Sequence, residues 1–236
     1  ATAEDQTTAI QAMAVQTTVT AGMMTNFPED LKLRHELKYP ISEQQAYILS
    51  RRLEKFFKRD KNSGSHGKYR VSSLYFDDPY DRALREKLNG AGKREKFRIR
   101  YYGEDTSFIR LEKKIKQRGL CSKLQTGLTK GECIDIVNGK SSFLIAKEDP
   151  LLQEFYFKLN SELLRPSCIV CYDREAFVYA PGNVRITLDL GLRSCRDPKR
   201  FFDRERPDMP MNMDMMGVLE LKYDEFLPEP AVSILR

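Results

Sequence analysis

The chain has 236 residues, 41% of them hydrophobic, which is enough to bury a sizeable core as one large domain and excludes a disordered protein. Its 40 Lys and Arg residues against 34 Asp and Glu residues give a formal net charge of +6, which favours an anionic partner and excludes a histone-like excess of basic charge. Two histidines are too few for a histidine-based metal site, and five cysteines, an odd number, predict reduced thiols in a cytoplasmic protein.

Residues 1–23 differ in composition from the rest of the chain. They are rich in Ala, Thr and Gln, and they contain neither a basic segment followed by an apolar run nor an apolar stretch long enough for a bilayer. We therefore expect an added or disordered extension, followed by a single domain over residues 24–236. No membrane segment is predicted in this chain. A separate membrane protein as partner and the oligomeric state are left open.

Alternating polar and apolar residues predict β-strands, and apolar residues at helical spacing predict helices. The predicted strands are 31–39, 69–78, 96–102, 108–116, 166–179, 184–190 and 217–223. The predicted helices are 42–57, 80–88, 129–138 and 149–164. Pro40 and Pro79 are expected to end the first two strands, a polar loop is expected over 58–68, and a turn is expected at Gly119. Residues 194–216 are expected to be an irregular excursion.

The stretch 96–116 is interpreted as a β-hairpin with its turn at 103–107. Successive side chains of a strand point to opposite faces, so Arg98 and Arg100 share one face while apolar side chains share the other. The charged face of the second strand carries Arg110, Glu112, Lys114 and Lys116. Lys113 is the only charge on the apolar face. A face with Arg or Lys at nearly every position indicates a polyanion as partner.

The same alternation of cations with an occasional carboxylate recurs in at least six of the predicted strands. In an open sheet such faces would be solvated, which is the ordinary interpretation for any one residue. If the strands close into a barrel, the charged faces line its lumen and the apolar faces point outward, where helices 42–57 and 149–164 can cover them. Because like charges repel in a confined space, such a lumen requires bound anions. The pattern favours an α+β fold with a closed barrel around a basic tunnel.

Seven short motifs follow one another along the chain. They are Arg34–Tyr39, Ser72–Asp78, Lys96–Tyr102, Leu111–Lys114, Tyr172–Arg174, Arg185–Asp189 and Leu219–Lys222. Their residues and order resemble the VTC-type polyphosphate polymerase domain, a branch of the triphosphate tunnel metalloenzymes that also include the CYTH proteins. The resemblance covers residues 31–228. It implies an antiparallel barrel of about eight strands, with helices packed on its outside.

The resemblance also implies roles for the charged residues. Catalytic contacts to a triphosphate or a growing phosphate chain would come from Lys38, Arg98, Arg100, Lys114 and Arg174. Further substrate contacts are expected from Arg34, Tyr75, Arg110, Lys116, Lys123, Arg185 and Lys222. A divalent ion, Mn²⁺ or Mg²⁺, would be held by Glu220. Further candidates, either for the metal or for orienting the cations, are Glu36, Glu112 and Asp189.

The sequence departs from the wider CYTH pattern at its first strand. Arg34 stands where that pattern has the first glutamate of Glu-x-Glu-x-Lys, which resembles the VTC branch and argues against a cyclase or a thiamine triphosphatase. A second departure concerns the end of the chain at Arg236, where the family continues through a further helix and a basic segment. We therefore expect a domain that is truncated at its C-terminus.

The leading hypothesis is a polyphosphate polymerase that transfers the γ-phosphate of ATP to a chain of inorganic polyphosphate inside the tunnel. Two alternatives stay open. One is a triphosphatase or polyphosphatase with water as the acceptor, and the other is a non-catalytic binder of polyphosphate or RNA. Nucleic acid is not the expected partner, because the carboxylates on the charged faces would repel its phosphates unless a metal ion intervened.

Overall fold

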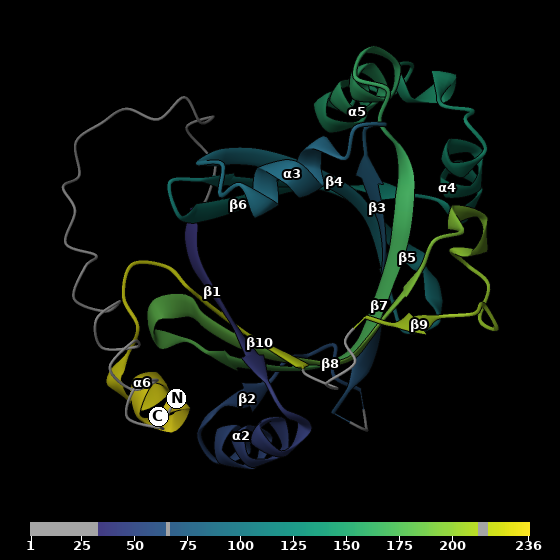
Figure 1. Ribbon diagram of the computed structural model, residues 1–236. Coiled ribbons are helices and arrows are strands. Elements are labelled where there is room, and N and C mark those ends of the chain that lie inside the picture. The colour runs from purple at the N-terminus through teal and green to yellow at the C-terminus, as the bar shows by residue number, and fades with distance from the viewer. Residues whose placement is uncertain (1–32, 65–66, 212–216) are drawn as a thin grey trace.

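The computed structural model describes residues 33–64, 67–211 and 217–236. The predicted extension over residues 1–23 and the first two residues of the predicted strand 31–39 lie outside the described residues. The described residues form an α+β fold, in which a closed ring of antiparallel strands carries helices on its outside (Figure 1).

Eight strands close the ring, and two short strands extend the sheet. The ring consists of β1 (Arg34–Ile41), β3 (Tyr69–Asp77), β4 (Lys93–Tyr102), β5 (Asp105–Gln117), β6 (Leu120–Leu128), β7 (Arg165–Tyr179), β8 (Val184–Cys195) and β10 (Gly217–Tyr223). The short strands are β2 (Lys58–Arg59), beside β7, and β9 (Met209–Pro210), beside β8. The order around the ring is β7-β3-β4-β5-β6-β1-β10-β8. Because β8 pairs back with β7, the predicted closed barrel is confirmed.

The pairings differ in extent around the ring. β5 pairs with β4 and with β6 along most of its length. In contrast, β1 meets β6 at only two positions, Arg34 opposite Cys121 and His35 opposite Leu120. On its other edge β1 pairs with β10 from His35 to Ile41. The contact between β1 and β6 is therefore the shortest seam of the ring.

Helices cover the outer face of the ring. They are α2 (Glu43–Phe56), α3 (Arg82–Leu88), α4 (Lys130–Val137), α5 (Pro150–Ser161) and α6 (Glu229–Leu235). Ser42 caps α2, because its hydroxyl accepts from the Gln45 N–H while the Gln45 side chain accepts from the Ser42 N–H. Asp149 caps α5 in the equivalent position. In Figure 1, α2 and α5 lie on opposite sides of the ring.

Two hydrophobic clusters hold these helices on the barrel. In the first, the buried Phe155 of α5 packs on Phe76 and Phe97, with ring centroids 5.0 and 5.2 Å apart. In the second, Leu53 of α2 is buried together with Ile186 and other apolar residues of β8 and β10. Both clusters use the outward faces of the strands. The charged faces are consequently left to the interior, as the alternation predicts.

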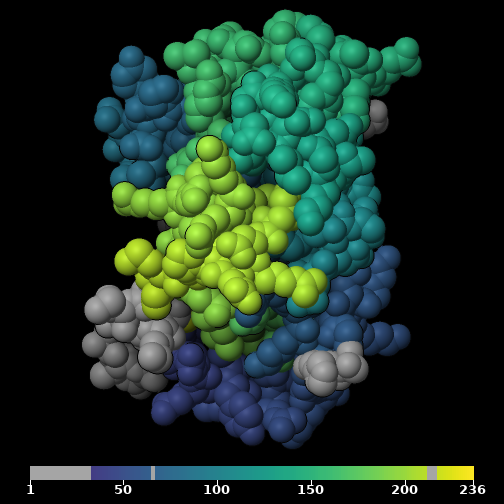
Figure 2. Space-filling view, turned by 90° about the vertical axis from the view of Figure 1, so that its right-hand side faces the viewer, coloured from purple at the N-terminus to yellow at the C-terminus, as the bar shows by residue number. Residues whose placement is uncertain are grey.

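Apart from a short 3-10 helix at Pro198–Arg200 and β9, residues 196–211 run irregularly over the outer wall, as predicted for this part of the excursion. Figure 2 shows this segment in yellow-green, between the region of α4 and α5 above and α2 below. Phe201 is buried in it and packs edge-on against Tyr101, whose hydroxyl donates to the Phe201 carbonyl at 3.0 Å. Residues 212–216 of the predicted excursion lie outside the described residues.

Several predicted boundaries are wrong. Pro40 does not end β1 but lies within it, at a position where β1 has only β10 as a neighbour, so its missing N–H is tolerated on the unpaired edge. β6 and α6 are missing from the prediction, and β4 begins three residues earlier than residue 96. β8 continues beyond residue 190 to Cys195, because its second half still pairs with β7.

The cysteines are free thiols, and four of the five are buried. Burial raises the pKa of the Cys133 thiol to about 12, so this side chain stays protonated and acts as a small apolar group. In the part of the chain that the structure describes, no helix combines the length and apolar character needed to cross a bilayer.

Candidate functional site

The interior of the ring, called the tunnel below, is lined by charged side chains from alternate strand positions. Across β4 and β5, Arg98 faces Glu112, while the neighbouring pair, Ile99 and Leu111, lies fully buried on the outer side. The predicted division of this hairpin into a charged and an apolar face is confirmed. Lys113, the exception on the apolar face, lies outside the tunnel.

Glu112 organises the first cation cluster of the tunnel. Its side chain is 1% exposed, and its Oε2 accepts from Arg98 Nε at 2.7 Å while its Oε1 accepts from Lys123 Nζ at 2.8 Å. Arg100 Nη1 lies 4.0 Å from the same carboxylate. Burial would raise the pKa of Glu112, but Arg98, Arg100 and Lys123 outweigh burial and hold that pKa well below its usual range. Glu112 therefore stays ionised and fixes three cations.

Hydroxyl groups hold the two arginines of this cluster from their other side. Arg98 Nη1 donates to the Tyr75 hydroxyl at 3.2 Å. Arg100 Nε donates to Ser73 Oγ at 2.8 Å, and its Nη2 donates to the Tyr172 hydroxyl at 3.1 Å. The guanidinium groups are thus preorganised, since little side-chain freedom remains to be lost on binding an anion.

Arg174 forms the connection between the two sides of the tunnel. Its Nε and Nη2 donate to the two carboxylate oxygens of Asp189 at 2.6 and 2.7 Å. The same Nη2 lies 3.2 Å from the Tyr172 hydroxyl and 3.6 Å from Glu220 Oε2. Arg174 and Asp189 are both 6% exposed, so this bidentate pair is shielded from solvent.

A second cluster combines three lysines with two carboxylates from β1 and β10. Lys38 Nζ lies 3.0 Å from Glu220 and 3.7 Å from Glu36. Lys222 Nζ lies 3.2 Å from Glu220 and 3.7 Å from Glu36. Lys114 of β5 donates to Glu36 at 2.7 Å and so reaches across β6 to β1. The two carboxylates therefore share the same ammonium groups.

The charges of the second cluster shift one another's protonation. Burial lowers the pKa of Lys222 to about 8, although Glu220 and Glu36 favour its charged form. Burial also acts on Lys38, but there Glu220 and Glu36 outweigh it and raise the pKa. For Glu220, the nearby Lys222, Lys38 and Arg174 outweigh burial and hold the pKa well below its usual range. Glu220 is therefore ionised at neutral pH.

The donor set of the second cluster fits a divalent ion. Mg²⁺ is commonly held by one or two carboxylates and completes its shell with phosphate oxygens and water. Glu36 and Glu220 supply two such carboxylates, already placed around common cations. Within the described ranges no group of three or more His, Cys, Asp or Glu side chains is close enough to hold a metal by itself. A metal at this place would therefore depend on substrate oxygens.

The four predicted metal ligands do not come together. Glu112 is occupied by Arg98 and Lys123 on one wall, and Asp189 is held bidentately by Arg174. Their surroundings match the second role considered for them, which is to orient the cations. Their assignment as metal ligands stays a prediction.

Two predicted substrate contacts, Arg185 and Arg34, bind other residues of the protein and belong to neither cluster. The guanidinium of Arg185 is bound by Asp60, which follows β2, and by the Tyr69 hydroxyl at 3.1 Å. Arg34 lies 2.9 Å from Asp224 and donates to a backbone carbonyl of the turn between β7 and β8. A phosphate group would have to compete with these partners.

Two more predicted substrate contacts, Arg110 and Lys116, lie toward opposite ends of the β4–β5 hairpin. Arg110 faces Arg100 across the strands and stacks on the ring of Phe108, 4.2 Å from its centroid. Lys116 faces Arg94 and makes no hydrogen bond or ion pair with another described residue. Neither belongs to the two clusters.

Some residues of the site are missing from the sequence prediction. Ser73 and Tyr172 hold Arg100, and Tyr172 also holds Arg174. The same alternation could have found both, because Ser73 lies two positions before Tyr75 and Tyr172 lies two positions before Arg174.

This arrangement can hold a chain of phosphates without a protein nucleophile. Arginine forks and lysine point charges neutralise phosphate oxygens, and a closed ring restricts water around them. Phosphoryl transfer needs such charge neutralisation and alignment more than covalent chemistry by the protein. The internal carboxylates keep the cations in place until an anion replaces them.

Known structures with a similar fold include three of low sequence identity. A candidate adenylate cyclase from Bacillus halodurans is 13% identical, with 87% of each chain covered and a TM-score of 0.49. A candidate adenylyl cyclase from Hippeastrum, with a dominant triphosphatase activity, is 10% identical over 86% of this chain and 84% of that chain, with a TM-score of 0.48. A chain of the Schizosaccharomyces pombe Mediator head module is 12% identical over 86% and 89%, with a TM-score of 0.46.

The sequence itself gives the family. No curated protein matches the chain. The sequence model of the VTC domain matches residues 33–236, which include every strand of the ring and both charged clusters. The chain therefore belongs to the VTC domain family.

Proposed function

We propose that this protein is a polyphosphate polymerase that transfers the γ-phosphate of ATP to a growing chain of inorganic polyphosphate in the tunnel. The observation that carries the proposal is the convergence of Arg98 and Arg100 from β4 and Arg174 from β7 inside one closed ring. Such a set of preorganised guanidinium groups suits consecutive phosphates better than a single anion. Membership of the VTC domain family supports the same substrate class.

The residues divide the work between holding and aligning. Arg98, Arg100 and Arg174 would grip the phosphates of the donor and of the chain, with Lys123 beside Glu112 as a further point charge. Their hydroxyl and carboxylate partners keep them from swinging away, so that attacking oxygen and γ-phosphorus stay in line. The reaction forms one phosphorus–oxygen bond to the chain terminus and breaks the bond to the leaving ADP.

A divalent ion would be held by Glu36 and Glu220 together with phosphate oxygens. When bound, Mn²⁺ or Mg²⁺ supplies additional neutralisation of the phosphate charge. Lys38 and Lys222 touch both carboxylates, so they are placed to turn toward the substrate once the carboxylates have another cation to hold.

The ion pairs of the tunnel carboxylates support transfer of the γ-phosphate to a phosphate chain rather than to water. Activation of water requires a group that can take its proton. Among the described residues of the tunnel, four carboxylates could take a proton: Glu36, Glu112, Asp189 and Glu220. Each of them has at least two contacts with Lys or Arg nitrogen atoms. A terminal phosphate oxygen of the chain needs no such base. Use of ATP and the reduced thiols fit a cytoplasmic reaction.

The test is incubation with ATP and Mn²⁺, followed by gel separation of the products. We expect long phosphate chains, and a loss of about a hundredfold or more in rate for Arg98→Ala, which removes a charge contact to the phosphates, and for Glu220→Ala, which removes a ligand of the divalent ion. Arg52→Ala on the exposed face of α2 is the matched control.

Two outcomes would contradict the polymerase. Production of ADP and orthophosphate without chains would identify a triphosphatase of the same fold. Binding of polyphosphate with no turnover of ATP in Mg²⁺, Mn²⁺ or Co²⁺ would identify a non-catalytic binding domain.

A further inference from the structure

The cationic face of the β4–β5 hairpin continues beyond the tunnel clusters. In register, Lys96 faces Lys114 and Arg94 faces Lys116, on the same side of the hairpin as Arg98. Arg94, Lys96 and Lys116 are named the outer ladder here. Facing positions on one strand pair are close neighbours, and like charges placed directly opposite each other destabilise a sheet. Two successive pairs on this face nevertheless consist of two cations each.

The outer ladder lacks the carboxylates that balance the tunnel. Arg98 has Glu112 and Lys114 has Glu36, whereas no member of the outer ladder makes a hydrogen bond or ion pair with a described residue. Burial and the nearby cations Lys87 and Arg94 lower the pKa of Lys96, and they outweigh Asp77 and Tyr75, which act in the opposite direction. Among the described residues the ladder is therefore a run of partly buried positive charge that forms no ion pair, although Asp77 lies near enough to favour the charged form of Lys96.

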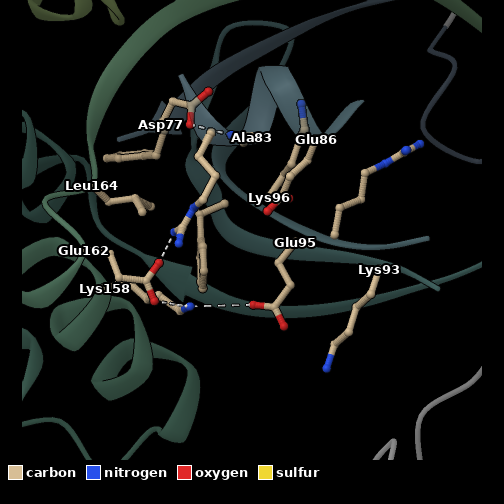
Figure 3. A pocket seen from close by; sticks show the side chains of 13 residues that line it. Asp77, Ala83, Glu86, Lys93, Glu95, Lys96, Lys158, Glu162 and Leu164 are labelled. Carbon is tan, nitrogen blue, oxygen red and sulfur yellow. Dashed lines mark hydrogen bonds and ion pairs between the residues drawn. The ribbon is translucent and has the colours of Figure 1, made fainter. Parts of the chain in front are cut away.

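A cavity borders the outer ladder, and residues from both faces of β4 line it, Glu95 and Phe97 as well as Arg94 and Lys96. α3 lies against the first residues of β4, and this cavity of about 220 Å³ opens between them (Figure 3). Two acids of this cavity, Glu95 and Glu162, are bound by Lys158. Asp77 accepts from backbone N–H groups at the start of α3, and Glu86 is the remaining acid of the lining. Among the described residues, none of these acids forms an ion pair with the ladder, and Asp77 acts on Lys96 from beyond ion-pair distance.

We propose that the outer ladder binds the section of an inorganic polyphosphate chain that extends beyond the tunnel, beside α3. Positions two apart on a strand are separated by about 6.8 Å, so the ladder offers cations at regular intervals in line with Arg98 and Lys114. The proposal rests on the proposed function for the identity of the chain, and it assigns this end of the hairpin as the route of the chain.

Inorganic polyphosphate is favoured over RNA by the composition of the ladder. Proteins that hold single-stranded nucleic acid interleave basic residues with aromatic side chains on which bases stack. The facing positions of the ladder are Arg or Lys, and no aromatic residue stands among Arg94, Lys96, Lys114 and Lys116. A linear chain with a charge on every unit and no base matches this pattern.

The test measures binding of inorganic phosphate chains of defined length, without ATP, to wild type and to the double variant Arg94→Gln/Lys96→Gln. We expect binding of chains of several tens of phosphates to weaken on the order of tenfold, and the slope of log K against log salt to fall by about one for each removed contact. Tripolyphosphate, which is short enough to lie within the tunnel, should lose much less affinity.

The matched control is Arg52→Gln/Lys55→Gln, which removes the same charge from exposed positions of α2, on another part of the barrel (Figure 1). Thermal unfolding without ligand should give the Arg94→Gln/Lys96→Gln variant a stability at least equal to wild type, because unfavourable like-charge pairs are removed. That result separates a binding defect from misfolding.

Three results would overturn the proposal: an equal loss for tripolyphosphate and long chains, a loss no larger than that of the control variant, or competition by single-stranded RNA as effective as that by polyphosphate. The test measures binding without ATP, so it does not depend on catalysis. A hydrolase or a binding domain would therefore still bind long chains more weakly after the substitutions. Failure of the polymerase assay and failure of this test are thereby distinguishable.

Discussion

At the scale of single residues, the tunnel is defined by which partner each charge has. Tyr75 is an example, because its hydroxyl accepts from Arg98 and its ring lies 5.9 Å from that guanidinium. Burial alone would raise the pKa of Tyr75, but Arg98, Arg100 and Lys38 outweigh burial and lower that pKa from 10.0 to about 8. Tyr75 therefore reports the positive potential of the tunnel.

Tyr75 should ionise about two pH units earlier than an ordinary tyrosine. Because the folded-state pKa lies below the unfolded one, ionisation adds stability that is absent below about pH 8 and grows as the pH rises toward 10. Ultraviolet difference spectra should show a phenolate step near pH 8 that disappears in Tyr75→Phe. Added tripolyphosphate should shift the step to higher pH, since a nearby anion opposes ionisation.

Other tyrosines serve as an internal control. Burial raises the pKa of Tyr69 and of Tyr172, so neither should contribute to the early step. Persistence of that step in Tyr75→Phe would contradict the assignment.

At the scale of elements, the position of β10 against β8 decides where Glu220 lies. β10 begins at Gly217, and a Cβ atom there would approach Leu190 Cδ2 to 2.3 Å and the Asp189 carbonyl to 2.8 Å. Both are closer than real side chains allow, and the carbonyl belongs to the backbone. Close approach of the two strands at this point therefore requires glycine.

Gly217→Ala should destabilise the protein by about 1 to 3 kcal/mol, because the added methyl group overpacks the β8–β10 contact. The matched control is Gly127→Ala in β6, where the added Cβ meets only Arg110 Nη1, at an ordinary 3.6 Å. Urea unfolding of both variants gives the comparison. An equal effect of the two substitutions would exclude the close approach as the cause.

At the scale of the whole molecule, the ring is closed unevenly. The seam between β1 and β6 has two facing pairs, and beside it the ion pair of Lys114 with Glu36 joins β5 to β1. An anion that is held by cations on both sides of this seam would act as a further link. We therefore expect bound substrate to stabilise the seam between β1 and β6.

Tripolyphosphate should slow hydrogen exchange in β1 and β6 more than in β7, whose pairings with β3 and β8 are long. At a ligand concentration one hundred times Kd, the unfolding free energy should rise by about 2.7 kcal/mol. Hydrogen exchange with mass spectrometry measures the first effect. Uniform protection of all strands would indicate general stabilisation without a special role for the seam.

The sequence by itself determined which side of each strand is charged. Strict alternation over residues 96–116 is enough to place Arg98 and Arg100 inward and to single out Lys113 as an exception. Lys113 confirms the rule, because it remains buried on the outer face only through ion pairs with Glu154 and Glu95. Propensity and capping likewise determined α2 and α5. β6 is missing from the prediction because its polar and apolar residues alternate only weakly.

Only the tertiary structure decided how the charges pair. Closing the ring brings β1 beside β10 and β8 beside β7, so Glu36 meets Lys222 and Arg174 meets both Asp189 and Glu220 across long stretches of sequence. Strand order and register select these neighbours, and the alternation within one strand does not show which distant strand will lie beside it. For that reason the inward cations could be predicted one by one. The division of the carboxylates into cation holders and a shared pair suited to a metal could not.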